Sequence, residues 1–285
     1  MTRRYVVVDA FTAEPLRGNP VAVILDAAGL DTATMQRIAG WTNLSETTFV
    51  LPATEPGAAY QLRIFTPRSE LPFAGHPTLG SLHAAIAIGL VEPQDRLIQQ
   101  CAAGLIELRC DPDRYWLRMP EAKSQKPDKA SGEALQSALG ARLVDPASLR
   151  LIDVGPRWLV AQLGSVQELL SLKPDYTRLA ALERQLGATG VTLFAPYTEG
   201  NATKIEVRSF APSDGINEDP VCGSGNGAVA AFRYGNAHLA AGAEYTAQQG
   251  QCVGRAGQVQ VRIDQQGAVW IGGQCVTTAD GLLHV

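Results

Sequence analysis

Residues 78–90, which read TLGSLHAAIAIGL, decide the fold of this chain. The segment has the length of a helix, but apolar residues occupy nearly every face of it rather than one stripe. Residues 225–234, GNGAVAAFRY, show the same pattern in the second half of the chain. Because a helix that is apolar on all sides must be buried on all sides, each segment requires a surrounding shell of other elements.

Short strand-like runs surround both segments. Runs of this kind, bounded by turn residues, indicate strands at 5–8, 21–25, 60–65, 104–109 and 115–119, and again at 158–163, 204–210, 258–263 and 268–275. Further helices are expected at 32–40 and 176–186. The sequence therefore predicts an α+β protein with two barrel-like, mostly antiparallel sheets, each curved around a central helix.

An internal repeat supports the idea of two similar halves. The pattern RxFxP occurs at 63–67 and again at 208–212, and the pattern ExPxxG occurs at 70–75 and again at 218–223. Each copy continues from a strand through a glycine turn into one of the two apolar helices. We expect duplicated domains related by a pseudo-twofold axis.

The predicted domain boundaries follow from this repeat and from local composition. Residues 1–120 form the expected N-terminal barrel, which residues 276–285 complete, and residues 138–275 form the C-terminal barrel. The polar segment EAKSQKPDKASGEALQS at 121–137, rich in Lys and Ser, is the expected linker.

Composition and charge exclude several classes of partner. The chain has 285 residues, of which 46% are hydrophobic and 18% charged, and its formal net charge is −4. Because Lys and Arg are scattered, we expect no nucleic acid partner. No apolar stretch approaches the roughly 20 residues of a membrane span, and a strand follows Met1–Arg4 where a signal peptide would be apolar. The sequence predicts a cytoplasmic protein with no membrane contact.

The five cysteines show no CxxC spacing, so neither a disulfide framework nor a thiolate zinc site is expected. Four of them lie among strand-like residues and are predicted to be buried: Cys101, Cys110, Cys252 and Cys275. The fifth, Cys222, directly precedes an apolar helix.

Both apolar helices begin after a glycine turn. Free backbone N–H groups and the positive end of the helix dipole make such a turn a binding site for anions. The segments Gly75–Thr78 and Gly223–Asn226 can therefore hold a substrate carboxylate without a metal. The alternative is that both segments are tight turns without a ligand.

Six motifs occur in an order that resembles the PhzF-type isomerase family of the diaminopimelate-epimerase-like fold. They are DAF at 9–11, RGNPVAV at 17–23, NLSETTFV at 43–50, FAGHPTLG at 73–80, EDPVCGS at 218–224 and QGxxxGR at 249–255. The resemblance covers most of the chain. It implies a homodimer of two-domain chains with the active site between the domains and no cofactor or metal.

The resemblance also implies roles for individual residues. Glu46 is the implied catalytic acid/base, with His76 and Asp219 beside it. The best characterised reaction of the family is the isomerisation of dihydrohydroxyanthranilate, a hydrogen shift on a cyclic amino acid. The residues implied to bind the substrate are Asn19, Ser45, Gly75, Gly223 and Ser224.

Physical chemistry sets a condition on Glu46. A carboxylate that carries a proton near neutral pH needs its pKa raised from about 4.3, through burial or a neighbouring carboxylate. Taken alone, Glu46 could equally be a surface acid, and Asp219 could cap the turn before Pro220. Ser224 could be a helix N-cap as well as a ligand, and His83 is expected to be a hydrogen-bonded core histidine.

Three functional classes remain at this point. A cofactor-independent isomerase that moves a proton on a small cyclic amino or hydroxy acid is the leading hypothesis. Racemases and epimerases of this fold use two cysteines, whereas this chain has Ala74 and Cys222 at the two helix starts. An epimerase that combines Cys222 with Glu46 is the second hypothesis, because a thiol at a helix start can be acidified. The third is a non-catalytic binder of small molecules.

Overall fold

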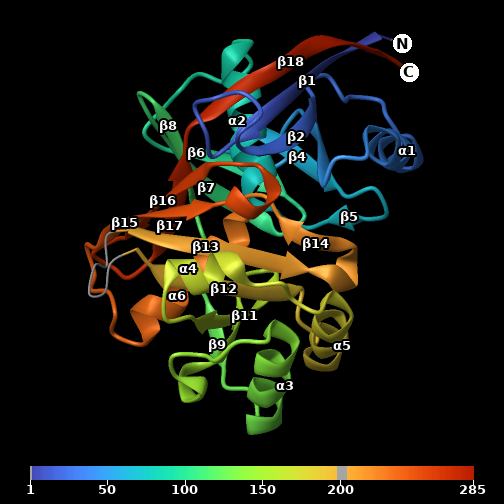
Figure 1. Cartoon of the computed structure of the whole chain (residues 1–285). Coiled ribbons are helices and arrows are strands. Elements are labelled where there is room, and N and C mark those ends of the chain that lie inside the picture. Colours follow the sequence, from blue (N-terminus) through green and yellow to red (C-terminus); the bar gives the residue numbers. More distant parts are fainter. Residues whose placement is uncertain (1, 198–203) are drawn as a thin grey trace. The chain divides into compact units, whose positions relative to one another are not determined.

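The computed structural model describes residues 2–197 and 204–285 and divides the chain into two compact units. The first unit comprises Met1–Arg118 and Gly272–Val285, and the second comprises Met119–Ile271. Both ends of the chain thus belong to the first unit. There β1 (Thr2–Ala10) pairs antiparallel with β18 (Cys275–His284), and Figure 1 shows these two strands side by side.

The first unit is a curved, mostly antiparallel sheet. Its other strands are β2 (Asn19–Ile24), β3 (Glu46–Leu51), β4 (Tyr60–Phe65), β5 (Glu70–Leu71), β6 (Leu97–Cys101), β7 (Gly104–Asp111) and β8 (Arg114–Arg118). Pairing runs in the order β18–β1–β2–β3–β4–β6–β7–β8, with β5 also paired to β4. Only the pairs β2/β3 and β4/β6 are parallel in this series.

Helix α2 (Gly75–Ala87) is the central helix of the first unit. It contacts β1, β2, β3, β4, β8 and β18, which are strands from both ends of the pairing order. Every residue from Gly75 to Ala85 except His83 is buried. The sheet therefore curves around this helix, as its apolar sequence requires.

The second unit contains the remaining elements. Its strands are β9 (Lys123–Gln125), β10 (Arg150–Asp153), β11 (Arg157–Gln162), β12 (Gly190–Pro196), β13 (Lys204–Ala211), β14 (Ile216–Asp219), β15 (Glu244–Gln249) and β16 (Gly257–Ile263), and β17 (Val269–Gly273) leads back into the first unit. Its α-helices are α3 (Lys129–Leu139), α4 (Val166–Ser171), α5 (Tyr176–Leu186) and α6 (Gly223–Gly235). Short 3₁₀ turns span Pro146–Ser148, Pro212–Asp214 and Gln251–Val253.

The second unit repeats the topology of the first. Pairing runs β9–β10–β11–β12–β13–β15–β16, with β14 also paired to β13, and the parallel pairs are β11/β12 and β13/β15. The central helix is α6, which contacts β10, β11, β12 and β16 and is buried from Gly223 to Ala230. The predicted fold of two similar α+β units, each with a central helix, is confirmed.

The sequence repeat corresponds to the same ion pair in each unit. Arg63 on β4 binds Glu70 on β5 through two hydrogen bonds of 2.7 Å. Arg208 on β13 binds Glu218 on β14 through hydrogen bonds of 2.9 and 2.7 Å. Each pair joins the two strands that lead into the central helix, so the RxFxP and ExPxxG patterns mark a duplicated structural unit.

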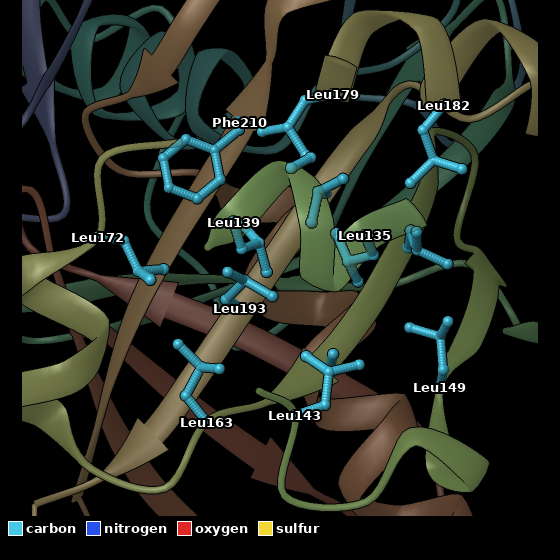
Figure 2. Packing of buried hydrophobic residues seen from close by; sticks show 14 of the residues in the cluster. Leu135, Leu139, Leu143, Leu149, Leu163, Leu172, Leu179, Leu182, Leu193 and Phe210 are labelled. Atoms are coloured by element: carbon cyan, nitrogen blue, oxygen red, sulfur yellow. The ribbon is translucent and has the colours of Figure 1, made fainter. Parts of the chain in front are cut away.

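The segment 121–137, predicted to be a linker, instead holds β9 and most of α3. Leu135 and Leu139 of α3 lie in the core of the second unit, where they pack with Leu179 and Leu182 of α5 (Figure 2). The prediction was wrong because Leu135 is the one leucine within 121–137, so its polar neighbours dominate the composition of the segment.

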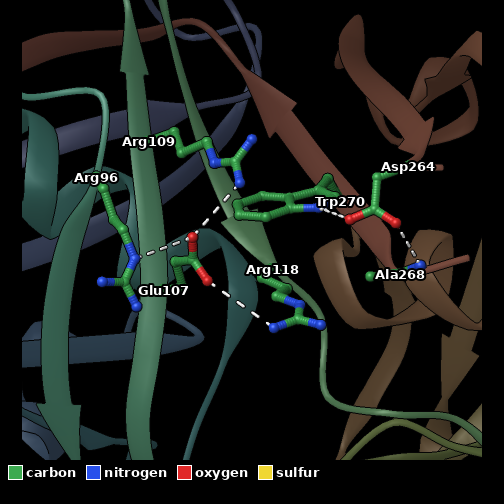
Figure 3. A network of polar contacts seen from close by, with 7 residues as sticks. All are labelled: Arg96, Glu107, Arg109, Arg118, Asp264, Ala268 and Trp270. Atoms are coloured by element: carbon green, nitrogen blue, oxygen red, sulfur yellow. Dashed lines mark hydrogen bonds and ion pairs between the residues drawn. The ribbon is translucent and has the colours of Figure 1, made fainter. Parts of the chain in front are cut away.

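The predicted strand at 268–275 is two strands, because β17 ends at Gly273 and β18 begins at Cys275. The turn before β17 is held by Asp264, which accepts hydrogen bonds from the Ala268 N–H at 2.8 Å and from Trp270 Nε1 at 3.0 Å (Figure 3). Figure 3 also shows an ion-pair network of the first unit, in which Arg96, Arg109 and Arg118 surround Glu107 at 3.3, 3.4 and 3.9 Å.

The structure contradicts the expected burial of Cys252 and bears out the expected hydrogen bonding of His83. Cys252 is exposed, contrary to the prediction, because it lies in the Gln251–Val253 turn and not in a strand. His83 is the hydrogen-bonded histidine that was expected, with its ring nitrogens 3.3 Å from the Tyr115 hydroxyl and 3.1 Å from the Thr277 hydroxyl. No helix in the described residues is long and apolar enough to cross a membrane.

The placement of α3 in the core predicts a stability effect. Leu135 is fully buried, so Leu135→Ala should lower the free energy of unfolding by about 2–5 kcal/mol. Leu105→Ala, at a side chain that is 54% exposed, should change it by no more than about 0.5 kcal/mol. Chemical denaturation followed by circular dichroism measures both. Equal effects of the two substitutions would contradict the assignment of α3 to the core.

Candidate active site

Three of the predicted site residues meet in the first unit. Asn19 is the first residue of β2, Glu46 is the first residue of β3, and His76 is the second residue of α2. β2 and β3 are parallel, with Glu46 opposite Val21, so both strands begin at the same edge of the sheet. The fold thus brings together three residues that are far apart in sequence.

The three side chains form a chain of close contacts. His76 Nε2 lies 3.2 Å from Glu46 Oε2, and the two side chains are only 5% and 12% exposed. On the other side of the imidazole ring, His76 Nδ1 lies 3.2 Å from Asn19 Nδ2, and this contact is fully buried. The site therefore consists of a carboxyl group, an imidazole and an amide in a largely dry environment.

The close approach of α2 to β2 positions this group. A Cβ atom at Gly80 would lie 2.4 Å from Val21 Cγ1, so only glycine permits the observed spacing. The next residue of α2, Ser81, contacts the other strand: its Oγ lies 2.8 Å from Thr48 Oγ1 on β3. These two contacts fix the helix start against both strands that carry the site.

Burial changes the acidity of Glu46. Removal from water raises the pKa of this carboxyl from 4.5 to about 7, although the neighbouring Ser45 hydroxyl opposes part of the rise. Proton transfer near neutral pH requires a raised pKa of Glu46, and burial, not a neighbouring carboxylate, raises it here. At neutral pH both protonation states of Glu46 are populated, which suits a group that takes and returns a proton.

The start of α2 has free hydrogen-bond donors beside this carboxyl. The N-cap residue, Ala74, has no side chain that can accept a hydrogen bond, and the first N–H bonded within the helix is that of Thr78, to Ala74 O at 3.3 Å. Pro77 has no N–H. The helix dipole and the backbone N–H of Gly75 are therefore available for an anion.

Ser45 and Gly75 also belong to the first unit, whereas Asp219, Gly223 and Ser224 lie in the second unit, around the start of α6. Asp219 ends β14 and accepts the Val221 N–H at 3.1 Å, so it does cap the turn before the helix. Ser224 is not the N-cap, because Cys222 occupies that position. The Ser224 hydroxyl instead accepts a hydrogen bond of 3.0 Å from Trp158 Nε1.

Cys222 has the environment of a structural thiol. Its sulfur accepts the Gly225 N–H at 3.2 Å, and the residue is only 4% exposed. Burial raises the pKa of this thiol well above its ordinary value, and the nearby Asp219 carboxylate raises it further. The acidification expected of a thiol at a helix start is absent because loss of hydration outweighs the helix dipole.

Two residues not predicted from the sequence hold this second turn. Gln249 accepts the Cys222 N–H at 3.1 Å and donates to Asp219 O at 3.0 Å. Asn226 donates to Cys222 O at 2.9 Å and to Gln249 Oε1 at 2.8 Å. The QGxxxGR motif contained Gln249, but spacing alone does not reveal that its amide bonds a turn 27 residues away.

Residues 2–197 and 204–285 contain no group of three or more His, Cys, Asp or Glu side chains arranged to hold a metal ion. The polar groups of the first unit's site are instead one carboxyl group, one imidazole, one amide and the backbone N–H of Gly75. This set can bind an anion and transfer protons.

Comparison with known proteins places these features in context. The sequence profile of the phenazine biosynthesis-like protein family, PhzC–PhzF, matches residues 8–281. The chain is 39% identical to antisense-enhancing sequence 1 of Schizosaccharomyces pombe, over 96% of each chain, and 36% identical to trans-2,3-dihydro-3-hydroxyanthranilate isomerase of Pseudomonas aeruginosa, over 99% of each. A solved PhzF-family structure from Bacillus anthracis superposes with a TM-score of 0.86 over the whole of both chains at 24% identity.

The contact between α2 and β2 predicts a specific sensitivity to added volume. Gly80→Ala should lower the free energy of unfolding by about 1–3 kcal/mol, because the new methyl group overlaps the stiff Val21 side chain. Gly235→Ala, in the other central helix, should cause no loss because its Cβ would meet open space. Denaturant titration of both variants checks this. If Gly80→Ala were as stable as Gly235→Ala, the close contact would not be a constraint.

Proposed function

Since this chain belongs to the phenazine biosynthesis-like PhzC–PhzF family and is an enzyme of the isomerase class, we propose that it moves a proton between two carbons of a small cyclic amino or hydroxy acid. In this proposal Glu46 is the general acid/base, and the reaction needs neither a cofactor nor a metal.

The observation that carries the proposal is the state of Glu46. Its carboxyl is buried, has a pKa of about 7 and lies 3.2 Å from His76 beside an uncapped helix start. A surface acid, the alternative considered from the sequence, would keep its ordinary acidity because water would solvate the carboxylate. A proton carrier at neutral pH requires the shift that burial supplies here.

The proposed reaction uses Glu46 twice. The carboxylate first takes a proton from one carbon of the substrate, and the electron pair of that C–H bond moves into the adjacent double bond system. The protonated Glu46 then returns the same proton to another carbon, so that the enzyme ends in its starting state. His76 Nε2, 3.2 Å from Oε2, stabilises the carboxylate between turnovers.

The substrate class follows from the helix start and from the relatives. The free N–H of Gly75 and the dipole of α2 favour a substrate carboxylate next to Glu46. Relatives from three Pseudomonas species are named trans-2,3-dihydro-3-hydroxyanthranilate isomerases, so the first substrate to test is that cyclic amino acid. Ser45 and Asn19 are the remaining first-unit residues that we propose to support binding.

We retain Asp219, Gly223 and Ser224 as proposed contributors to catalysis or substrate binding from the second unit. Asp219 already accepts the Val221 N–H, and Ser224 is only 8% exposed. In this proposal the substrate uses the remaining acceptor sites of the Asp219 carboxylate and the exposed part of Ser224. The homodimer implied by the family resemblance also stays a prediction.

The epimerase hypothesis receives less support. It requires an acid and a base on opposite faces of one carbon, with Cys222 as one of them. Cys222 is buried and its pKa is raised, so the reactive thiolate is disfavoured, and Ala74 offers no thiol at the other helix start. A transfer along one face by Glu46 alone is the simpler chemistry for this arrangement.

Replacing the proton carrier should remove activity but not the fold. We expect Glu46→Gln to reduce turnover by about 10²- to 10⁴-fold, because the amide keeps the shape but cannot transfer a proton. The assay is the conversion of trans-2,3-dihydro-3-hydroxyanthranilate, or a related cyclic acid, to its isomer, followed by chromatography. Glu92→Gln, at an exposed carboxylate, is the control and should be fully active. Retention of activity in Glu46→Gln would eliminate the proposed mechanism.

The pH dependence follows from the raised pKa. The first step needs the carboxylate form of Glu46, so kcat/KM should be low at pH 5, rise with pH and level off above about 7. An inflection near the ordinary pKa of 4.5 would show that Glu46 is not the group that limits activity.

The thiol provides the test between isomerase and epimerase. Cys222→Ser should retain most activity, since the serine oxygen can still accept the Gly225 N–H, and Cys222→Thr should be the milder change. Turnover and chiral analysis of the product measure both activities. A loss as deep as that of Glu46→Gln, together with inversion of a stereocentre, would favour the epimerase.

A further inference from the structure

Asn19 is placed with little freedom. It opens β2 directly after Gly18, where a Cβ atom would lie 2.2 Å from Ala10 O, so the chain can enter the strand only through glycine. Asn19 pairs with Ala10 in the sheet and is 1% exposed. Its side chain is therefore fixed by the backbone on one side and by the packing of α2 on the other.

The contact between Asn19 and His76 determines where the imidazole carries its proton. The Asn19 amide nitrogen is a donor and cannot accept a hydrogen bond. In the amide orientation of this structure Asn19 Nδ2 lies 3.2 Å from His76 Nδ1, so Nδ1 is the acceptor; the rotated amide would place Oδ1 against a protonated Nδ1 and would require the opposite tautomer. With the observed orientation, the proton of a neutral imidazole is on Nε2, the nitrogen that faces Glu46 at 3.2 Å.

This choice of tautomer matters for a proton carried by Glu46. With a proton already on Nε2, the imidazole presents a donor and no lone pair to Glu46 Oε2, 3.2 Å away, so this nitrogen cannot take up the proton that Glu46 carries. In the other tautomer the Nε2 lone pair would face Glu46. It would repel the carboxylate, and it would accept the proton after Glu46 had taken it from the substrate.

We propose that Asn19 is a positioning residue that holds His76 in the Nε2–H tautomer and so prevents the imidazole from taking the proton that Glu46 carries. The proposal rests on the role of Glu46 in the proposed function. It gives Asn19 a purpose other than the substrate binding implied by the family resemblance. An amide suits this purpose because it has no charge and does not titrate.

Nitrogen NMR of ¹⁵N-histidine-labelled protein tests the proposal without a substrate. The chain has only four histidines, so His76→Gln identifies the signals of His76 by their loss. In the wild type at neutral pH we expect a protonated Nε2 and an unprotonated Nδ1. A protonated Nδ1 with an unprotonated Nε2 would overturn the proposal, even if no variant of Asn19 could be purified.

The variant Asn19→Asp reverses the hydrogen bond. A carboxylate can only accept, so Nδ1 of His76 should gain a proton, and turnover should fall while the fold is kept. Asn236→Asp is the matched control, because Asn236 donates to Phe232 O at the end of α6 and is remote in sequence from the site. It should leave the His76 signals unchanged. An unprotonated Nδ1 in Asn19→Asp would contradict the positioning role.

The two hypotheses can fail separately. If Glu46→Gln kept its activity while His76 showed the expected tautomer, the proposed function would fail and the hydrogen-bond assignment would stand. If Glu46→Gln were inactive and His76 carried its proton on Nδ1, Glu46 would remain the acid/base and the role of Asn19 would be rejected.

Discussion

The burial of α2 against β2 and β3 is the constraint on which the rest of the first unit depends. A helix that is apolar on every face is stable only inside the sheet, and Gly80 lets it approach Val21 closely enough to be enclosed. The start of the helix then lies where two parallel strands begin, so Glu46 is removed from water and its pKa rises. Packing and acidity thus have a single cause.

The two units share a topology but have different helix starts. In the first unit the N-cap is Ala74, whose side chain cannot accept a hydrogen bond, so the Gly75 N–H is left available. In the second unit the thiol of Cys222 accepts the N–H of Gly225, and Gln249 and Asn226 bond the turn that precedes it. The first helix start thus has an available N–H, whereas the second is a hydrogen-bonded turn that carries the same repeated motif.

The sequence predicted those features that one-dimensional patterns encode. Apolar helices predict central helices, and a repeated Arg–Glu pattern predicts duplicated units. The composition-based prediction of a linker at 121–137 failed because one buried leucine, Leu135, is a weak signal among polar residues. The hydrogen bonds of the Gln249 amide, the bond from the Trp158 indole to Ser224 and the contact between Asn19 and His76 all join distant residues, which no local pattern contains.

The central claim is that Glu46 is the group that carries the proton, and the most direct test is the titration of its carboxyl carbon by ¹³C NMR. Burial also raises the pKa values of Glu183 and Glu206 to about 7, so the signal must be identified by its loss in Glu46→Gln. The account predicts a pKa of about 7 for Glu46. A value near 4.5, that of a carboxyl in water, would contradict it.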